Sequence, residues 1–413
     1  MKIFLGLFFL WTNANGAQDK EVIVSVMCWY SPLGSLNGVR NWQVGGYQYE
    51  RNRNGESKAN YPVPSALKLP PQLVPGSEEY HALMAEAAKL ELAKIKSGGF
   101  DVAVFDMLPW PAYDPASPAS ITNVPFNEFR TFLSWLKAGE SVGIKVGFSP
   151  DVQNRSGDYP KGYKLNAEEW VRNLAGAYDQ IKDYPALWKI EGRPAAIHFG
   201  TSILAGNSPP VPGDPDPDCG WRKVLSKLKE MGKNFYFIAD IRPLDKNIEE
   251  WSKIADAVYS FAPAGPKNYF AEIHPILEKK FSIPFLWIAS PGYYAPAVKS
   301  YTEPDFERVH KTYLAAIKSG TKRMVFLTWN DFGEDTDIAP SANKGNCLLD
   351  VVAYYNEWFK SGKQPEIAAE KIIVSYPAFI PENISTKVPV WGEPKKNQER
   401  YEVSEAVLKD NPN

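Results

Sequence analysis

The chain has 413 residues, of which 44% are hydrophobic and 23% are charged, and its formal net charge is -2. This apolar content supports a large buried core and excludes a disordered chain. The near-neutral charge, with no basic block, argues against a nucleic-acid partner, because phosphate binding needs clustered Lys and Arg. The length fits one barrel-sized domain with a short extension better than two equal domains.

The first 17 residues are typical of a signal peptide. Lys2 supplies a positive charge, and the apolar run from Ile3 to Trp11 is too short to span a bilayer. Small residues then offer a cleavage site after Gly16 or Ala17. A buried helix and a lipoprotein signal are the alternatives, and the absence of Cys at the cleavage site disfavours the second. We therefore predict export, to the periplasm or the medium, with no membrane span.

After this segment, apolar runs alternate with helical patterns. Eight runs lack the polar alternation of half-exposed strands, which is typical of parallel strands that are buried on both faces. The predicted strands lie at 22–29, 101–108, 143–148, 194–199, 234–240, 257–261, 284–289 and 323–329. The predicted helices lie near 77–98, from 125, and near 166–178, 221–231, 248–254, 269–280, 302–319 and 348–359.

Eight strand–helix units predict a (β/α)8 barrel over residues 18–363. A doubly wound open sheet is the competing topology. Its usual G-x-G-x-x-G signature is absent after the first strand, where the chain reads MCWYSPLGS. From residue 364 to 413 the pattern changes to a polar C-terminal extension, in which KIIVSY (371–376) predicts one more strand.

The residues at the carboxyl ends of the predicted strands are the candidates for function, because (β/α)8 barrels place their sites there. They are mainly carboxylates and aromatics, which suits the cleavage of glycosidic bonds. Structural roles are the alternative, above all a core position for the histidine and for the tryptophan of strand seven. The candidate substrate-binding residues are Trp29, Tyr30, Asp106, Trp110, Asp151, His198, Asp240, Trp287, Tyr293, Trp329 and Asn330.

An acidic pair three residues apart follows the eighth strand directly. Asp331 and Glu334 flank Gly333, which permits a tight turn, so both carboxylates can face one cavity. Glycoside hydrolysis needs such a pair, because one carboxylic acid protonates the leaving oxygen while the second carboxylate activates water or attacks carbon. We predict that Asp331 and Glu334 are catalytic; two solvated loop acids are the alternative.

The patterns that other hydrolytic mechanisms need do not occur. The sequence has no G-x-S-x-G nucleophile motif. Its three cysteines, Cys28, Cys219 and Cys347, match no zinc spacing, and its four histidines form no catalytic pattern. We therefore predict no metal site and no cofactor. Whether Cys219 and Cys347 form a disulfide stays open.

Two segments resemble known glycoside hydrolase families. The run LTWNDFGEDTDIAPS (327–341) resembles the strand-eight signature of glycoside hydrolase family 71, the α-1,3-glucanases, and more loosely the motif of the family 99 endo-α-mannosidases. The run YPALWKIEGRPAAIHF (184–199) resembles the family 99 segment that precedes strand four. The resemblance implies a (β/α)8 barrel, cofactor-free endo-acting hydrolysis of α-linked glycans, and Asp331 and Glu334 as the two catalytic acids.

The two families imply different stereochemistry. Family 71 enzymes invert, which would make Glu334 the general acid and Asp331 the base, whereas family 99 enzymes retain through a substrate hydroxyl. MCWYSPLGS departs from family 71, which has a His-Phe or His-Tyr run at the end of strand one. We predict a secreted, monomeric glycoside hydrolase whose partner is an α-1,3-glucan-like polysaccharide or oligosaccharide. The alternatives are a family 99-like retaining endo-α-mannosidase activity and a non-catalytic carbohydrate-binding barrel.

Overall fold

The structure is a computed structural model of the whole chain, and part of that chain is described. The described residues are 20–28, 77–107, 124–151, 166–199, 220–241, 251–261, 269–295, 300–302, 306–331, 334, 336–340, 345–366, 371–376 and 402–407.

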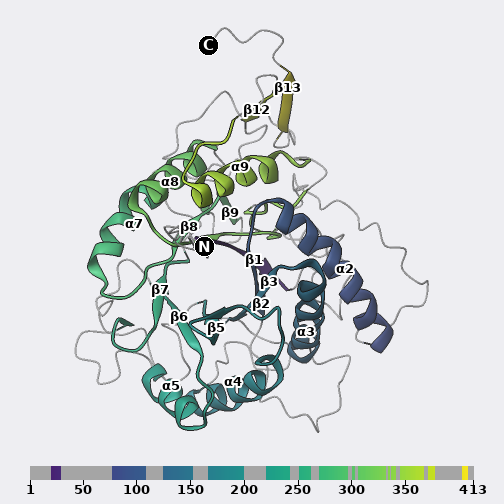
Figure 1. Ribbon diagram of the computed structural model, residues 1–413, viewed down its shortest axis with the longest axis vertical. Helices are drawn as coiled ribbons and strands as arrows, with labels where there is room; N and C mark the ends of the chain where they lie inside the picture. Colours follow the sequence, from purple (N-terminus) through teal and green to yellow (C-terminus); the bar gives the residue numbers. More distant parts are fainter. Residues whose placement is uncertain are drawn as a thin grey trace, which may run out of the picture.

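Eight parallel strands lie side by side in the order β7-β6-β5-β3-β2-β1-β11-β8 (Figure 1). The two ends of this sheet meet, because Val258 of β7 forms a parallel bridge with Phe285, just before β8. Val258 N donates to Pro284 O at 3.0 Å, and Leu286 N donates to Val258 O at 2.9 Å. The strands are β1 (Glu21–Met27), β2 (Val102–Met107), β3 (Lys145–Pro150), β5 (Arg193–Ile197), β6 (Tyr236–Asp240), β7 (Ala257–Tyr259), β8 (Trp287–Ala289) and β11 (Arg323–Phe326).

Helices surround the strands, so the predicted (β/α)8 barrel is confirmed (Figure 1). Ser77 caps the first of them, since its side chain accepts a hydrogen bond from Tyr80 N. Asn166 and Glu169 form a reciprocal capping box at the start of another. The helices are α2 (Glu78–Ser97), α3 (Val124–Val142), α4 (Ala167–Ile181), α5 (Trp221–Glu230), α7 (Tyr269–Lys280), α8 (Phe306–Ser319) and α9 (Cys347–Ser361).

The core has two layers that are separated by the barrel wall. One cluster of buried side chains fills the inside of the barrel and includes Val104, Ile197 and Ile238. The other lies between the strands and the helices and includes Phe105 and Phe237. Because neighbouring residues of a strand point to opposite faces, each strand contributes to both layers. This alternation determines which residues at the strand ends point toward the mouth of the barrel.

Further short strands lie outside the eight parallel strands of the barrel. β4 (Lys189–Ile190) pairs antiparallel with β5, and β9 (Tyr293–Ala295) pairs antiparallel with β10 (Ser300–Thr302). The strand predicted at 371–376 is confirmed as β12 (Lys371–Tyr376), which pairs antiparallel with β13 (Glu402–Val407) beyond α9 (Figure 1). In the described part of the chain, no helix is both long and apolar enough to cross a membrane.

Candidate active site

The segment after β11 is folded into a compact loop by hydrogen bonds between its two ends. Thr328 N donates to Thr336 O at 3.0 Å, and the two hydroxyls lie 2.9 Å apart. Asp331 N donates to the Thr328 hydroxyl at 3.0 Å, and Ala339 N donates to Trp329 O at 2.8 Å. The two threonines are buried, so water does not compete for these bonds. Hydrogen bonds between its two ends therefore keep the loop that carries the acidic pair in one compact conformation.

Asp331 and Glu334 lie next to each other at the carboxyl end of the barrel. Glu334 N donates to Asp331 Oδ1 at 3.1 Å and also to Asp331 O at 3.3 Å. Asp331 is 6% exposed, whereas Glu334 is half-buried. A backbone N–H that donates to a carboxylate oxygen suits a negative charge on that carboxylate. The two acids therefore differ in their surroundings, one enclosed and one open to the mouth.

Tyr293 of β9 also contacts this pair, from the segment that follows β8, the strand paired with β11. Its hydroxyl donates to Glu334 Oε1 at 3.3 Å. Burial raises the pKa of Tyr293 above its ordinary value, and the nearby charges of Glu334 and Asp331 raise it further. The phenol is therefore protonated through the neutral range and remains a hydrogen-bond donor. The structure thus brings together three of the predicted site residues.

Asn330 fastens the loop to β1. Met27 N donates to Asn330 Oδ1 at 2.7 Å, and Asn330 Nδ2 donates to Met27 O at 3.0 Å. The amide thus continues the backbone pairing of β1 and β11, and its side chain is fully buried. Asn330 was predicted to bind substrate. In the structure its amide bonds to the backbone of β1 and so holds the backbone that leads into Asp331 in place.

Trp329 fastens the same loop to α2. Its indole Nε1 donates to Glu91 Oε2 at 3.2 Å, and its backbone N donates to Ser25 O at 2.7 Å. The ring is fully buried in the layer between the strands and the helices. Trp329 was predicted to bind substrate, and in the structure no face of its ring is exposed to do so. No role for Glu91 was predicted from the sequence. Its position on the buried face of α2, beside Leu92, could have indicated a structural role.

His198 and Trp287 also lie in the layer between the barrel and the helices, and the structure does not bring them to the mouth. The His198 ring is fully buried, with its centroid 4.6 Å from that of Trp221 and 5.7 Å from that of Trp170. Burial lowers the pKa of His198 to about 3. Trp287 Nε1 donates to Glu278 Oε2 of α7 at 3.2 Å. Both side chains therefore attach helices to the barrel, and neither has a face open to substrate.

Three further carboxylates stand at strand ends beside the mouth, each at most 2% exposed. Asp106 and Asp240 lie two residues after Val104 and Ile238, which face the inside of the barrel, so they face the same side. A hydrogen bond from the backbone N of Phe261 to Asp240 Oδ1, at 2.8 Å, ties β6 to the end of β7. The three are Asp106, Asp151 and Asp240.

Other predictions lie outside the described residues. These are the substrate-binding roles of Trp29, Tyr30 and Trp110. Cys219 also lies outside the described residues, so whether it pairs with Cys347 stays open. Among the residues that are described, no group of three or more His, Cys, Asp or Glu side chains is arranged to hold a metal ion.

The described residues define a (β/α)8 barrel with a carboxylate pair after its eighth strand, at the end where such barrels carry their sites. No protein-family model matches the sequence, and no curated protein matches it either. The chain is similar in structure to a GH99 endo-α-mannosidase from Bacteroides thetaiotaomicron in complex with bis-tris propane. That match has a TM-score of 0.56 and 15% identity, and covers 83% of this chain and 97% of the other.

A second structure of the GH99 endo-α-mannosidase from Bacteroides thetaiotaomicron matches with a TM-score of 0.54 and 15% identity, over 84% of this chain and 99% of the other. At this identity the likeness concerns the fold. It shows that the barrel fold is shared over most of both chains.

Proposed function

We propose that this protein is a glycoside hydrolase for α-linked glycans, with Asp331 and Glu334 as its catalytic acids. One observation carries the proposal. The buried threonine bridge and the Asn330–Met27 pairing hold an enclosed carboxylate beside a half-buried one at the mouth of the barrel. A pair of carboxyl groups in different surroundings is what acid and base roles require.

The surroundings favour Asp331 as the base and Glu334 as the acid. Asp331 accepts a backbone hydrogen bond, which suits the ionised form that a base needs before it takes a proton. Glu334 is more accessible, so its carboxyl group can reach a glycosidic oxygen at the mouth. In this scheme Glu334 gives its proton to the leaving oxygen as the bond from that oxygen to the anomeric carbon breaks. Asp331 takes a proton from the water whose oxygen bonds to that carbon.

Tyr293 restricts the orientation of Glu334 in this scheme. Its hydroxyl donates to Glu334 Oε1, which leaves Glu334 Oε2 to carry the proton toward the substrate. A fixed carboxyl orientation contributes to catalysis because the proton donor must lie within hydrogen-bond distance of the leaving oxygen.

The motif after strand eight favours an α-1,3-glucan as the substrate, with inversion. The likeness in fold to a GH99 endo-α-mannosidase favours a second candidate, an α-mannoside cleaved within the chain. These candidates differ in product and in stereochemistry. Incubation with α-1,3-glucan and with α-mannan, followed by NMR of the anomeric protons over time, separates them, because inversion first yields the β-anomer and retention the α-anomer.

The catalytic assignment is tested with Asp331→Asn and Glu334→Gln. Each substitution keeps the size of the side chain and removes the ionisable group, so we expect the release of reducing sugar to fall by about 100-fold or more. Glu272→Gln, at an exposed position on α7, is the matched control and should keep full activity. If the protein only binds glycans, wild type and all variants should bind them, and even wild type should release no reducing sugar. That result would reject the proposal.

We further infer that the protein is exported through residues 1–17. The support is the charged start, the short apolar run and the small residues that follow. Mass spectrometry of the protein recovered outside the cytoplasm should find a new N-terminus at residue 17 or 18. Recovery of the intact chain from the cytoplasm alone would contradict export.

A further inference from the structure

The turn that follows β8 brings Tyr293 to the acidic pair. It runs through Ser290, Pro291 and Gly292, which are all buried, and reaches Tyr293 at the start of β9. Ser290 is 1% exposed, and its hydroxyl donates to Gly292 O at 3.0 Å. Pro291 lies between them and has no backbone N–H to donate. The Ser290 side chain therefore supplies a hydrogen bond that holds this turn in its folded shape.

This turn and the loop of the acidic pair start from the same place in the barrel wall. β8 pairs with β11, and Leu327 N, directly after β11, donates to Ala289 O at 2.8 Å. One segment then continues from Ser290 to Tyr293, and the other continues to Glu334. They meet again where the Tyr293 hydroxyl donates to Glu334 Oε1 at 3.3 Å. The two segments thus form a closed ring, so the shape of the shorter one affects where the phenol meets Glu334.

Tyr293 has a second support, in β10. It pairs with Thr302 in the antiparallel ladder of β9 and β10. This ladder is a separate two-stranded sheet, so it does not by itself fix the distance of Tyr293 from the barrel wall. The turn is the direct covalent connection between that wall and Tyr293, and the Ser290 hydroxyl is the side-chain group that folds it.

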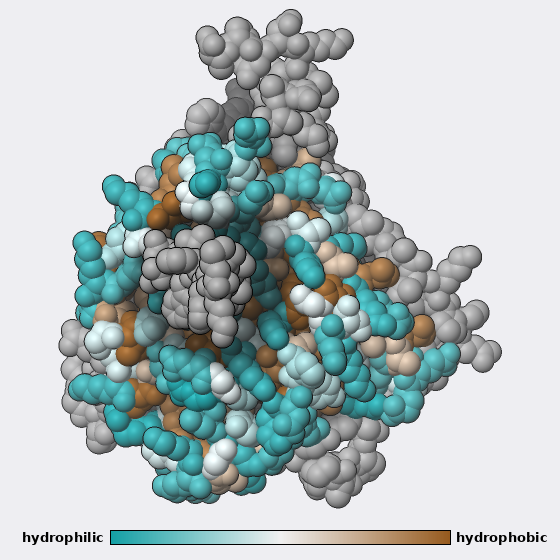
Figure 2. Space-filling model, in the orientation of Figure 1, coloured by the Kyte–Doolittle hydropathy of each residue, from teal (hydrophilic) through white to brown (hydrophobic). Residues whose placement is uncertain are grey.

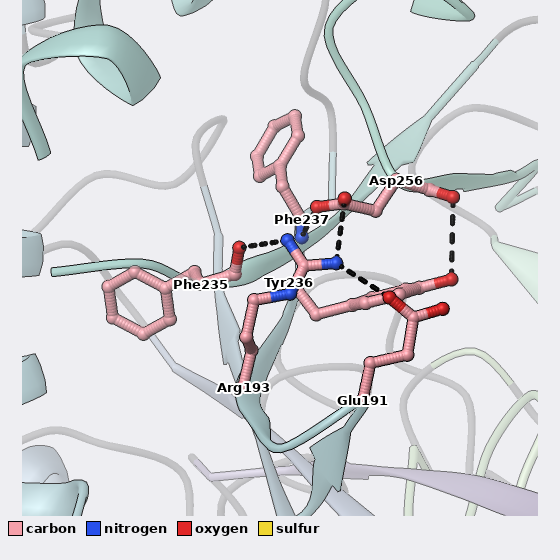
Figure 3. A network of polar contacts seen from close by, with 6 residues as sticks. All are labelled: Glu191, Arg193, Phe235, Tyr236, Phe237 and Asp256. Carbon is pink, nitrogen blue, oxygen red and sulfur yellow. Dashed lines mark hydrogen bonds and ion pairs between the residues drawn. The ribbon is translucent and has the colours of Figure 1, made fainter. Parts of the chain in front are cut away.

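The contact made by Ser290 differs from one that only holds strands together. A contact of that kind is seen at the amino end of the barrel, where Arg193 Nη2 lies 2.9 Å from Asp256 Oδ1 and the backbone N of Phe237 donates to Asp256 Oδ2 at 2.9 Å (Figure 3). Those two charged side chains join β5, β6 and the residue before β7. They are partly exposed and lie beside α5, in a region where the surface over α4 and α5 is mainly hydrophilic (Figure 2). The Ser290 hydroxyl is enclosed and bonds within a single turn, so it joins no two strands.

We propose that Ser290 is a positioning residue of the candidate active site, which acts through the turn and Tyr293 on the carboxyl group of Glu334. The inference rests on the proposed function, because it takes Glu334 as the acid that protonates the leaving oxygen. Ser290 is buried, so it acts through Tyr293 and not by contact with the substrate. Its hydroxyl keeps the turn in the shape that places the phenol on Glu334 Oε1, which leaves the other carboxyl oxygen directed to the glycosidic bond.

The test compares two substrates that differ in their need for the acid. When a glycan is cleaved, the leaving oxygen takes a proton from Glu334 as its bond to the anomeric carbon breaks. An α-glycosyl fluoride releases fluoride ion, which departs without that proton. Asp331 takes a proton from the attacking water in both reactions. A misplaced Glu334 should therefore slow the cleavage of the glycan and not that of the fluoride.

The substrates are α-1,3-glucan or α-mannan, whichever the wild type cleaves, and the α-fluoride of the matching disaccharide. For Ser290→Ala we expect kcat on the glycan to fall by about 5-fold and kcat on the fluoride to stay unchanged. The ratio of the two rates does not depend on how much of the variant is folded, so a loss of stability cannot imitate this result. Ser290→Ala combined with Tyr293→Phe should be no slower on the glycan than Tyr293→Phe alone, because the hydroxyl acts through that phenol.

Ser260→Ala is the matched control. Ser260 is also 1% exposed and directly follows a barrel strand, β7. In the described part of the chain its hydroxyl has no hydrogen-bond partner, so the substitution removes the same atom without the loss of a bond. This variant should match wild type on both substrates.

Three results would overturn the proposal and leave the proposed function intact. The first is equal cleavage of the glycan by Ser290→Ala and wild type. The second is an equal loss on both substrates, which would reduce Ser290 to a structural role. The third is additive losses in the double variant, which would mean that Ser290 does not act through Tyr293. A wild type that cleaves neither substrate would instead reject the proposed function, and this inference with it.

Discussion

Thr328 and Thr336 join the two ends of the loop that holds the acidic pair. Their hydroxyls lie 2.9 Å apart, and the backbone N of Thr328 donates to the carbonyl oxygen of Thr336 at 3.0 Å. The Thr328 hydroxyl also accepts a hydrogen bond from Asp331 N. The same buried oxygen therefore connects the closure of the loop to the position of the first acid.

Replacement of Thr336 by Val should loosen this loop. The substitution keeps the shape of the side chain but leaves the buried Thr328 hydroxyl without that partner, at a cost of about 1–3 kcal/mol. We expect kcat to fall more than KM rises, since the acids lose their alignment while the substrate surface remains. Thr336→Ser keeps the hydroxyl and is the control. Equal kinetics for Thr336→Val and wild type would show that the bridge does not position Asp331.

Tyr293→Phe should lower kcat/KM by about 10-fold, because a hydrogen bond to a carboxyl group is lost. The pH dependence provides a sharper test. Burial, followed by the charges of Glu334 and Asp331, raises the pKa of Tyr293 above its ordinary value of 10.0. The phenol thus stays protonated up to at least pH 10, and the variant should lose activity equally at pH 6 and pH 9. An alkaline limb that vanishes in Tyr293→Phe would mean that this tyrosine titrates below 10.

His198 should make the fold sensitive to acid. Burial lowers its pKa from 6.5 to about 3, so the folded state resists a proton that the unfolded state accepts. Its stabilising contribution is complete above pH 6.5 and is lost as the pH falls from 6.5 toward 3, at about 1.4 kcal/mol per pH unit. Urea unfolding of His198→Gln and wild type at pH 8 and pH 5 measures this. The difference between the two pH values should be smaller for the variant, and an unchanged difference would refute the assignment.

The barrel could be predicted from the sequence because its strands are continuous apolar runs. All eight predicted strands occur in order, although several are shorter than expected: strand 284–289 is reduced to β8, Trp287–Ala289. The same apolar runs gave no indication of whether a side chain points into the barrel or toward the helices. A strand that is buried on both faces shows no polar alternation, so the predictions for His198 and Trp287 could not distinguish the mouth of the barrel from the helix layer.

The support of the site could not be predicted for a different reason. Asn330 bonds to a residue 303 positions earlier, and Trp329 to one 238 positions earlier. Contacts across such separations leave no local pattern in a single sequence. The acidic pair itself was recognisable because Asp331 and Glu334 are close in sequence as well as in space, and a short loop with a glycine is a local signal.

The contact between Trp329 and Glu91 offers a test of how α2 supports the loop. Glu91→Leu leaves the buried indole Nε1 without its partner, which should reduce the free energy of unfolding by about 1–3 kcal/mol. Glu91→Gln keeps an oxygen that can accept the bond, so its stability should lie close to that of wild type. Because the same tryptophan leads directly into Asn330 and Asp331, Glu91→Leu should also lower kcat, whereas Glu86→Leu, at an exposed position on the same helix, should not. Urea unfolding and steady-state kinetics on all three variants measure both effects. Full activity in a destabilised Glu91→Leu would show that α2 stabilises the barrel without positioning the acids.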